Sequence, residues 1–433
     1  MRDIIGAPAG WLARAIRTKQ VSSLEVVRAH LEHIHTVNPR LNAVVFATGE
    51  SALKQARAAD RKNSTRKAVL GPLHGVPFTA KDIFDTAGLP TTAGLRMLRS
   101  NIPDRDATVV ARMRAAGAIL IGKTLCPPGG VGGEGGDSWN SLHGGTRNPY
   151  DIARSPGASS SGEAAIIAAG GSPVGLGSDS GGSIRMPAHY CGIAALKPTT
   201  GLVPSTGAYA LPGGLSDPRS QVGPMARFVA DLMLTLPLLV GPDGVDSAVV
   251  PVPLAKRTPQ LKGLKVAWYA DDGIAKPTQA ISAAVRSAAR ALGEAGCTVT
   301  EARPPALHEA HQVTLGYWGD KRMSHDRLYR RWDAFRTEML GFMSSFDLIV
   351  SPVAPDIAPL YRSKVVVRNL YSYTSPYSLS GNPCVVVRAG TSHEGLPIGV
   401  QVVARNWHDD VALRAAHAIE RALGGWRPAS VVG

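Results

Sequence analysis

The stretch from Ser155 to Pro198 reads SPGASSSGEAAIIAAGGSPVGLGSDSGGSIRMPAHYCGIAALKP and sets serines and glycines on both sides of an apolar segment of small residues. We interpret residues 164–170 as a helix and residues 172–177 as a strand that pack closely because their side chains are small. The strand leads into SDSGGSI at residues 178–184. There, consecutive backbone N–H groups with little side-chain bulk surround the Ser183 hydroxyl. Such a loop suits the stabilisation of an oxyanion.

Short apolar segments alternate with helical ones around this stretch. We expect strands at residues 75–78, 118–123 and 264–269 and a helix at 107–116. An alternation of this kind predicts an α/β fold with a buried sheet. Residues 8–36 have helical periodicity, with a serine cap before Glu25, and we expect them to pack outside the sheet.

Length and composition narrow the classes of protein. A chain of 433 residues with 44% hydrophobic residues buries a large core, in two or three domains or in one large α/β domain. The four cysteines lie far apart and form no C-x-x-C pair, which fits a reducing compartment. The N-terminus lacks the apolar core of a signal peptide, and no apolar run is long enough to span a bilayer. We therefore expect a soluble, cytoplasmic protein.

The net charge of +14 raises the question of a nucleic-acid partner. Arginines are spread along the whole chain, and the modest basic cluster at residues 321–336 is mixed with aspartates. No aromatic-glycine RNA motif accompanies it. We expect solvated surface charge and no nucleic-acid partner.

Two groups of histidines bear on metal binding. His30, His33 and His35 do not share one helical face, and we expect a solvent-facing polar stripe. His308 and His311 miss the i, i+4 spacing of a zinc-binding helix. We expect neither a metal nor any other cofactor.

A catalytic role for Ser183 requires a base, because an unassisted serine hydroxyl is a weak nucleophile. The motif GVPFTAKD at residues 75–82 supplies Lys81. With these motifs the chain resembles the amidase signature family, whose members use a serine, a cis-serine and a lysine. The resemblance assigns Ser183, Ser159 and Lys81 to these positions, with the serine spacing of the fatty acid amide hydrolase branch. The resemblance covers most of the chain and extends to residues 38–43, 148–151, 223–227, 346–352, 381–383 and 395–401.

The resemblance implies a fold. It predicts one amidase signature domain over residues 1–433, in which a mixed central β-sheet is covered by helices on both sides. Residues 60–230 form the core that carries the catalytic motifs. Residues 279–343 form a mostly helical subregion, whose aromatic residues we interpret as core because of their helical spacing.

The resemblance also implies roles. Lys81, made neutral by burial, accepts a proton through Ser159, and Ser183 attacks. The backbone N–H groups of Ser180, Gly181, Gly182 and Ser183 form the oxyanion hole.

Asp179 and Arg185 flank this loop and are predicted to brace it. Glu163 matches a glutamate of the same branch. Ala158 and Ser161 replace two glycines that are common in the family motif.

We therefore predict a hydrolase of small-molecule amides, with carbamates and aryl esters as additional substrates. One alternative is the glutamine-hydrolysing A subunit of a tRNA-dependent amidotransferase. That subunit usually carries glutamine where this chain has Met186, and a methionine favours an apolar pocket. The other alternative, a catalytically silent binding protein on the same scaffold, is disfavoured by the retained Lys81, Ser159 and Ser183.

The glycine-rich residues 127–145, with Trp139, and the loop after Gly201 are candidate walls of the site. The sequence leaves a homodimer open.

Overall fold

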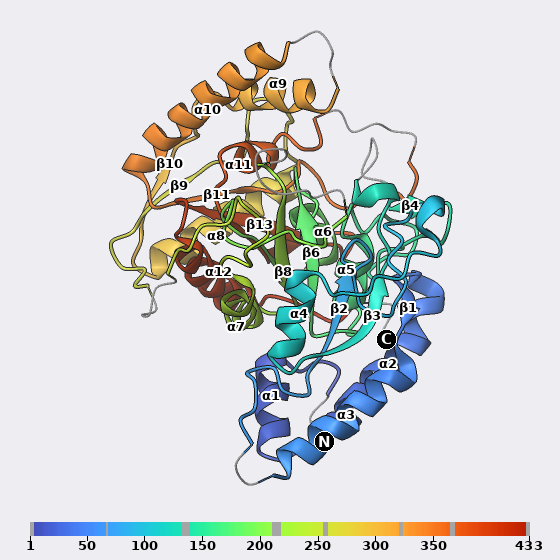
Figure 1. Ribbon diagram of the computed structural model, residues 1–433. Helices are drawn as coiled ribbons and strands as arrows, with labels where there is room; N and C mark the ends of the chain where they lie inside the picture. The colour runs from blue at the N-terminus through green and yellow to red at the C-terminus, as the bar shows by residue number, and fades with distance from the viewer. Residues whose placement is uncertain are drawn as a thin grey trace.

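An eleven-stranded sheet runs through the molecule (Figure 1). The computed structural model describes residues 4–65, 68–131, 138–209, 218–253, 259–319, 324–363 and 369–429. The strands, from one edge of the sheet to the other, are β1 (Val44–Ala47), β3 (Ile119–Thr124), β2 (Pro77–Lys81), β6 (Val174–Asp179), β8 (Gln221–Ala226), β7 (Ala194–Lys197), β12 (Cys384–Thr391), β13 (Pro397–Ala404), β11 (Leu348–Pro352), β9 (Lys265–Trp268) and β10 (Thr298–Glu301). A separate hairpin pairs β4 (Trp139–Asn140) with β5 (Gly144–Gly145).

The sheet is mixed, as predicted. Strand β2 is parallel to β3 and β6, and β9 is parallel to β10 and β11. The other pairs are antiparallel. Parallel neighbours need long crossover connections, which here contain helices, and this is why apolar strand segments alternate with helical ones in the sequence.

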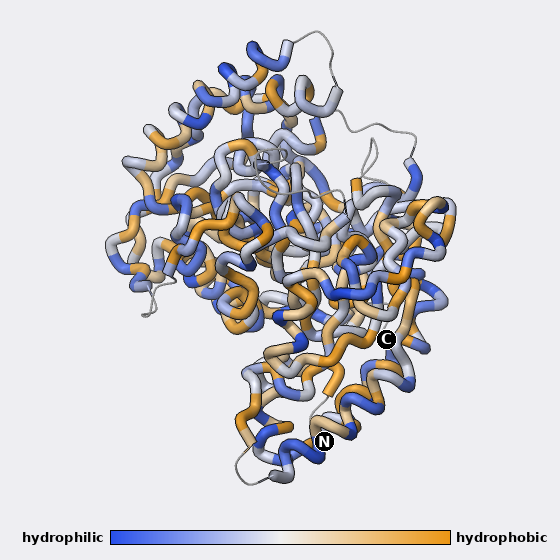
Figure 2. The backbone as a smooth tube through the Cα atoms, viewed as in Figure 1, coloured by the Kyte–Doolittle hydropathy of each residue, from blue (hydrophilic) through white to orange (hydrophobic). Residues whose placement is uncertain are grey.

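Helices cover both faces of the sheet, which confirms the predicted single α/β domain (Figure 1). One face packs against α4 (Thr108–Ala115), α7 (Val229–Leu239), α8 (Gln279–Glu294) and α12 (Asp409–Leu423). The other packs against α2 (Ser23–Leu41), α3 (Gly49–Asn63), α5 (Ser161–Ala168), α6 (Arg185–Cys191), α9 (Leu307–Tyr317), α10 (His325–Ser345) and α11 (Ser375–Leu379). Helix α1 (Ala9–Arg17) packs on α7. Figure 2 shows hydrophobic segments through the middle of the molecule and alternating hydropathy along the outer helices.

Strand β2 carries two kinds of side chain on its two faces. Phe78 and Ala80 belong to the apolar core on the α4 and α7 side. Successive side chains of a strand point to opposite faces, so Thr79 and Lys81 project toward α5. An irregularity in the pairing of β2 with β3 sets Thr124 opposite Lys81. Strand β2 thus directs its polar side chains toward α5.

Helix α2 begins with the predicted serine cap, but its histidines do not all face solvent as predicted. The Ser22 side chain accepts the Glu25 N–H, and Glu25 reciprocates in a capping box at the start of α2. His30 on the same helix is fully buried, and its Nδ1 lies 2.9 Å from the Val26 carbonyl oxygen. The expected solvent-facing histidine stripe is therefore wrong for His30, because this face of α2 packs on the domain.

Residues 279–343 contain α8, β10, α9 and most of α10, with residues 320–323 outside the described part. Trp332 and Phe335 of α10 are buried, as the helical spacing predicts. Within the described ranges, no helix is both long enough and apolar enough to cross a bilayer.

Candidate active site

The buried amine of Lys81 lies at the centre of the predicted site. Its side chain is 0% exposed, and its Nζ lies 2.6 Å from Ser159 Oγ and 2.8 Å from Ser178 Oγ. The carbonyl oxygen of Gly130 is 3.4 Å away. The peptide bond between Ala158 and Ser159 is cis, although Ala158 stands where the family motif usually has glycine. We call Lys81, Ser159 and Ser178 the catalytic cluster, after the catalytic role predicted for Lys81 and Ser159.

These contacts suit a neutral amine. Burial lowers the pKa of Lys81 to about 8. A neutral amine has two N–H groups and one lone pair, and the Gly130 carbonyl accepts but does not donate. When Gly130 and Ser178 each accept one N–H, the lone pair is left for the Ser159 hydroxyl. The cluster can therefore take a proton from Ser159.

Residues 180–184 connect β6 to α6 and include Ser183, the predicted nucleophile, which is half-buried. We call residues 180–183 the nucleophile loop. The backbone N–H of Ser160 donates to the Ser183 carbonyl oxygen at 3.1 Å, which ties the Ser159 segment to this loop. Gly182 has a φ of +144°, and a Cβ at this position would lie 2.7 Å from Thr374 Oγ1. Glycine is required there for both reasons.

Asp179 and Arg185 form a fully buried ion pair under the nucleophile loop, with Arg185 Nη2 2.9 Å from Asp179 Oδ1. Asp179 also accepts the backbone N–H of Gly182 at 2.7 Å and of Ile184 at 3.1 Å. Burial opposes ionisation, but the charge and hydrogen bonds of Arg185 hold the pKa of Asp179 below its ordinary value. Arg185 donates further to the Thr374 carbonyl oxygen at 2.7 Å.

The expected oxyanion hole differs from the geometry at one position. The Gly182 N–H is already donated to Asp179, because the carboxylate sits inside the turn. The backbone N–H groups of Ser180, Gly181 and Ser183 stay the predicted donors. The Ser180 side chain contacts the Ser220 hydroxyl.

Aromatic side chains from outside the catalytic motifs border the nucleophile loop. Trp318 lies against Gly181, where a Cβ would come within 2.6 Å of the indole ring. Tyr371 meets Trp318 edge to face at 5.2 Å, and the Arg219 guanidinium lies 3.4 Å from the Tyr317 ring centroid. We call Tyr317, Trp318 and Tyr371 the aromatic wall. The interpretation of the aromatic residues as core is wrong for Trp318, which is 45% exposed, and for Tyr329 of α10, which is 49% exposed.

Met186 does not line an open pocket. It is 1% exposed and belongs to an apolar cluster between α5 and α6, with its side chain beneath Gly182. The argument for an apolar substrate pocket therefore finds no support in Met186, because the first turn of α6 directs this side chain into the core.

Sequence reasoning missed Ser178 and the Gly130 carbonyl. Ser178 directly precedes Asp179 in the predicted motif, and this position was its one signal. Gly130 belongs to the glycine-rich segment expected as a wall, of which residues 132–137 lie outside the described part. Residues 210–217 of the second expected wall also lie outside it. A backbone carbonyl gives no sequence signal at all.

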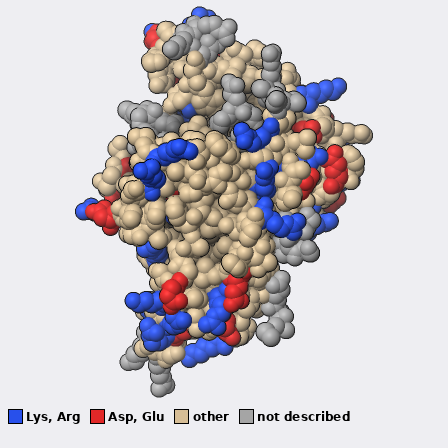
Figure 3. All heavy atoms as spheres, turned by 90° about the vertical axis from the view of Figure 1, so that its right-hand side faces the viewer, with Lys and Arg blue, Asp and Glu red and all other residues tan. Residues whose placement is uncertain are grey.

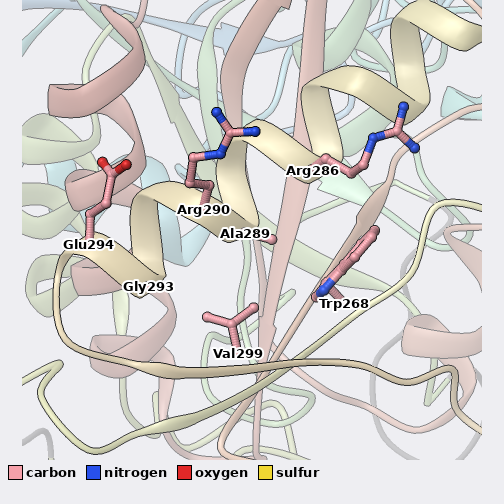
Figure 4. A pocket seen from close by; sticks show the side chains of 7 residues that line it. All are labelled: Trp268, Arg286, Ala289, Arg290, Gly293, Glu294 and Val299. Carbon is pink, nitrogen blue, oxygen red and sulfur yellow. The ribbon is translucent and has the colours of Figure 1, made fainter.

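A surface hollow of about 530 Å³ lies elsewhere in the fold (Figure 4). It is lined by Arg286, Ala289, Arg290, Gly293 and Glu294 of α8, Trp268 of β9 and Val299 of β10. Strands β9 and β10 form the edge of the sheet remote from β2. The hollow therefore contains none of the catalytic cluster.

Comparison with known proteins identifies the class. The sequence model of the Amidase family matches residues 25–329 and 319–413. The chain belongs to this family, the amidase signature enzymes.

Individual relatives point to more than one activity. The chain is 33% identical to the Acylamidase of Rhodococcus erythropolis over 94% of both proteins. It is 32% identical to the A subunit of the Glutamyl-tRNA(Gln) amidotransferase of Chloroflexus aggregans, also over 94% of both. The solved structure of a Fatty acid amide hydrolase superposes with a TM-score of 0.88 and 27% identity, covering 97% of this chain and 86% of that one.

Proposed function

We propose that this protein is an amidohydrolase that cleaves the C–N bond of neutral linear amides through an acyl-enzyme on Ser183, with carbamates and aryl esters as additional substrates. The observation that carries the proposal is the buried, hydrogen-bonded amine of Lys81, 2.6 Å from Ser159 Oγ. The similarity to the Acylamidase of Rhodococcus erythropolis supports the same reaction class.

The first half-reaction forms the acyl-enzyme. Ser183 Oγ attacks the amide carbonyl carbon, its proton passes to Ser159 Oγ, and the Ser159 proton passes to Lys81 Nζ. Negative charge then develops on the carbonyl oxygen, toward which the N–H groups of the nucleophile loop are predicted to point. The reaction needs no cofactor.

The remaining steps release the two products. Amines leave poorly without a proton, so Ser159 returns one to the nitrogen as the C–N bond breaks, and Lys81 restores the proton of Ser159. Water then attacks the acyl carbon by the same relay, and the carboxylic acid departs. Each proton taken up by Lys81 is given back, and the enzyme ends unchanged.

The amidotransferase A subunit remains the alternative, because several relatives that match the chain at 31 to 33% identity carry that name. Glutamine carries a charged head group whose desolvation must be offset by paired ligands. On the face drawn in Figure 3, basic side chains form separate groups, several beside acidic ones. This distribution supports a small-molecule substrate over a tRNA partner.

Purified protein tests the two functions directly. We expect hydrolysis of a neutral aryl amide without any partner, no turnover of glutamine and no gain of activity with tRNA. A preference for glutamine, or activity that depends on tRNA and a partner protein, would establish the alternative.

A further inference from the structure

Glu163 is a buried carboxylate that no step of the proposed reaction uses. It lies in the first turn of α5 and is 0% exposed. The Thr79 hydroxyl of β2 donates to Oε1, and the Thr124 hydroxyl of β3 donates to Oε2 at 2.7 Å. A buried charge is costly unless it is hydrogen-bonded. Two strands therefore provide a built site for this carboxylate.

The register of these strands sets the carboxylate beside the catalytic lysine. Thr79 lies two residues before Lys81 on β2, so both side chains project from the same face. Thr124 pairs with Lys81 across the ladder between β2 and β3. On the neighbouring β6, a Cβ at Gly175 would overlap Glu163 Oε1, so glycine leaves room for the carboxylate. The two threonines that bind the carboxylate are thus the residue two before Lys81 on β2 and the residue paired with Lys81 on β3.

The other titratable groups near Lys81 are either neutral while it titrates or ion-paired with another cation. Burial raises the pKa of the Cys126 thiol to about 12, so this thiol is neutral while Lys81 titrates. Asp179 is ion-paired with Arg185 at 2.9 Å.

Asp82, on the adjoining turn, is likewise ion-paired with Lys123 at 3.2 Å. Glu163 differs from Asp179 and Asp82, because no Lys, Arg or His nitrogen of the described residues lies within 4.0 Å of its carboxylate. Burial raises the pKa of Glu163 to about 8, against the two threonine donors and the charge of Lys81, so the carboxyl ionises in the same pH range in which Lys81 loses its proton.

We propose that Glu163 is a positioning residue that acts through Lys81, as the buried counter-charge that sets how readily the lysine releases its proton. The inference rests on the proposed function, since it takes Lys81 as the base. Burial lowers the pKa of Lys81, and an ionised Glu163 raises it, because opposite charges stabilise each other. A base is most effective when its pKa lies near the working pH. Glu163 thus keeps Lys81 basic enough to take the proton.

The test is the pH profile of kcat/KM for a neutral anilide in Glu163→Gln. Gln keeps the size of the side chain and removes its charge. We expect the midpoint of the acid limb to move down by roughly one pH unit. The plateau at high pH should fall several-fold, because Lys81 becomes a weaker base. Glu163→Asp retains the charge, and its midpoint should return toward that of the wild type.

A matched control neutralises a different buried carboxylate. Asp409 starts α12 and accepts the Thr199 hydroxyl at 2.6 Å. Its charge acts on Lys197 and not on Lys81. Asp409→Asn should therefore leave the midpoint of the acid limb in place, whatever it does to stability.

The outcomes separate the inference from the proposed function. A midpoint that is unmoved or raised in folded Glu163→Gln overturns the inference alone. If this variant does not fold, Thr124→Val takes its place: it removes one donor to the carboxylate, and an unmoved midpoint there overturns the inference as well. A wild-type protein that hydrolyses no amide overturns the proposed function, and the inference with it.

Discussion

The catalytic cluster and the aromatic wall both border the nucleophile loop, but they are built in different ways. Lys81 and Ser159 are fully buried and held by hydrogen bonds, one of them only 2.6 Å long. Trp318 is 45% exposed and held by ring contacts such as its 5.2 Å edge-to-face pair with Tyr371. The cluster comes from β2, β6 and the segment before α5, whereas the wall comes from the end of α9 and the segment before α11.

This difference separates two tasks. Hydrogen bonds have a direction, so the cluster can specify the path of a proton, and in the proposed reaction every substrate uses that path. Contacts of aromatic rings have weaker directional demands and mainly bury apolar area. We therefore expect changes in the cluster to affect all substrates strongly. Changes in the wall should instead alter the order of kcat/KM among substrates.

Ser183→Ala should have the largest effect, because it removes the attacking atom. We expect kcat to fall on the order of 10⁴-fold or more for amides and esters alike. In the wild type, mass spectrometry after reaction with a fluorophosphonate should place the adduct on Ser183. Ser161→Ala is the matched control, since its hydroxyl donates to the Leu125 carbonyl oxygen and to no other group of the described residues, and it should keep the label. A label on a different serine would move the nucleophile elsewhere.

Lys81→Ala should lower amide turnover by roughly 10² to 10⁴-fold, the usual range for losing a general base. In the wild type, activity should rise with pH through about 8, because Lys81 must be neutral and burial lowers its pKa to about 8. Lys81→Arg keeps the positive charge but cannot give up its proton, and it should be inactive as well. A flat wild-type profile from about pH 6 to 9, or an active Lys81→Arg protein, contradicts the role of base.

Ser159→Ala should show whether Ser159 delivers a proton to the leaving group. Amide nitrogen needs a proton to leave, whereas a nitrophenolate does not. We expect amide hydrolysis to fall at least about tenfold further than nitrophenyl ester hydrolysis, measured as kcat on matched acyl groups. Equal losses on both substrates would remove the basis for a relay through Ser159.

The sequence predicts the cluster better than the wall for a physical reason. Lys81 and Ser159 of the cluster lie, like Ser183, in motifs that occur in order and with the family's spacing, so the pattern is specific. Ser178 escaped prediction, because its contact with Lys81 depends on the pairing of β6 with β2. Helical spacing shows which residues share a face of a helix but not what that face meets. Trp332 meets the core, while Trp318 meets Gly181, whose missing side chain admits the ring. The buried positions of His30 and Met186 escaped prediction because they too depend on tertiary packing.

Trp318→Ala should have the smallest effect and the most selective one. Losing apolar contact at a binding site is worth about 1 to 3 kcal/mol, and a half-exposed ring belongs at the low end. We expect kcat/KM for aryl amides to fall roughly tenfold, mainly through KM, while short aliphatic amides change little. Tyr329→Ala is the matched control, because Tyr329 is 49% exposed in the same helical region but stacks on Trp332. In Tyr329→Ala, the ratio of kcat/KM for aryl amides to that for aliphatic amides should equal the wild-type ratio. If Trp318→Ala instead lowers kcat equally for both classes, the wall supports the nucleophile loop and does not select substrates.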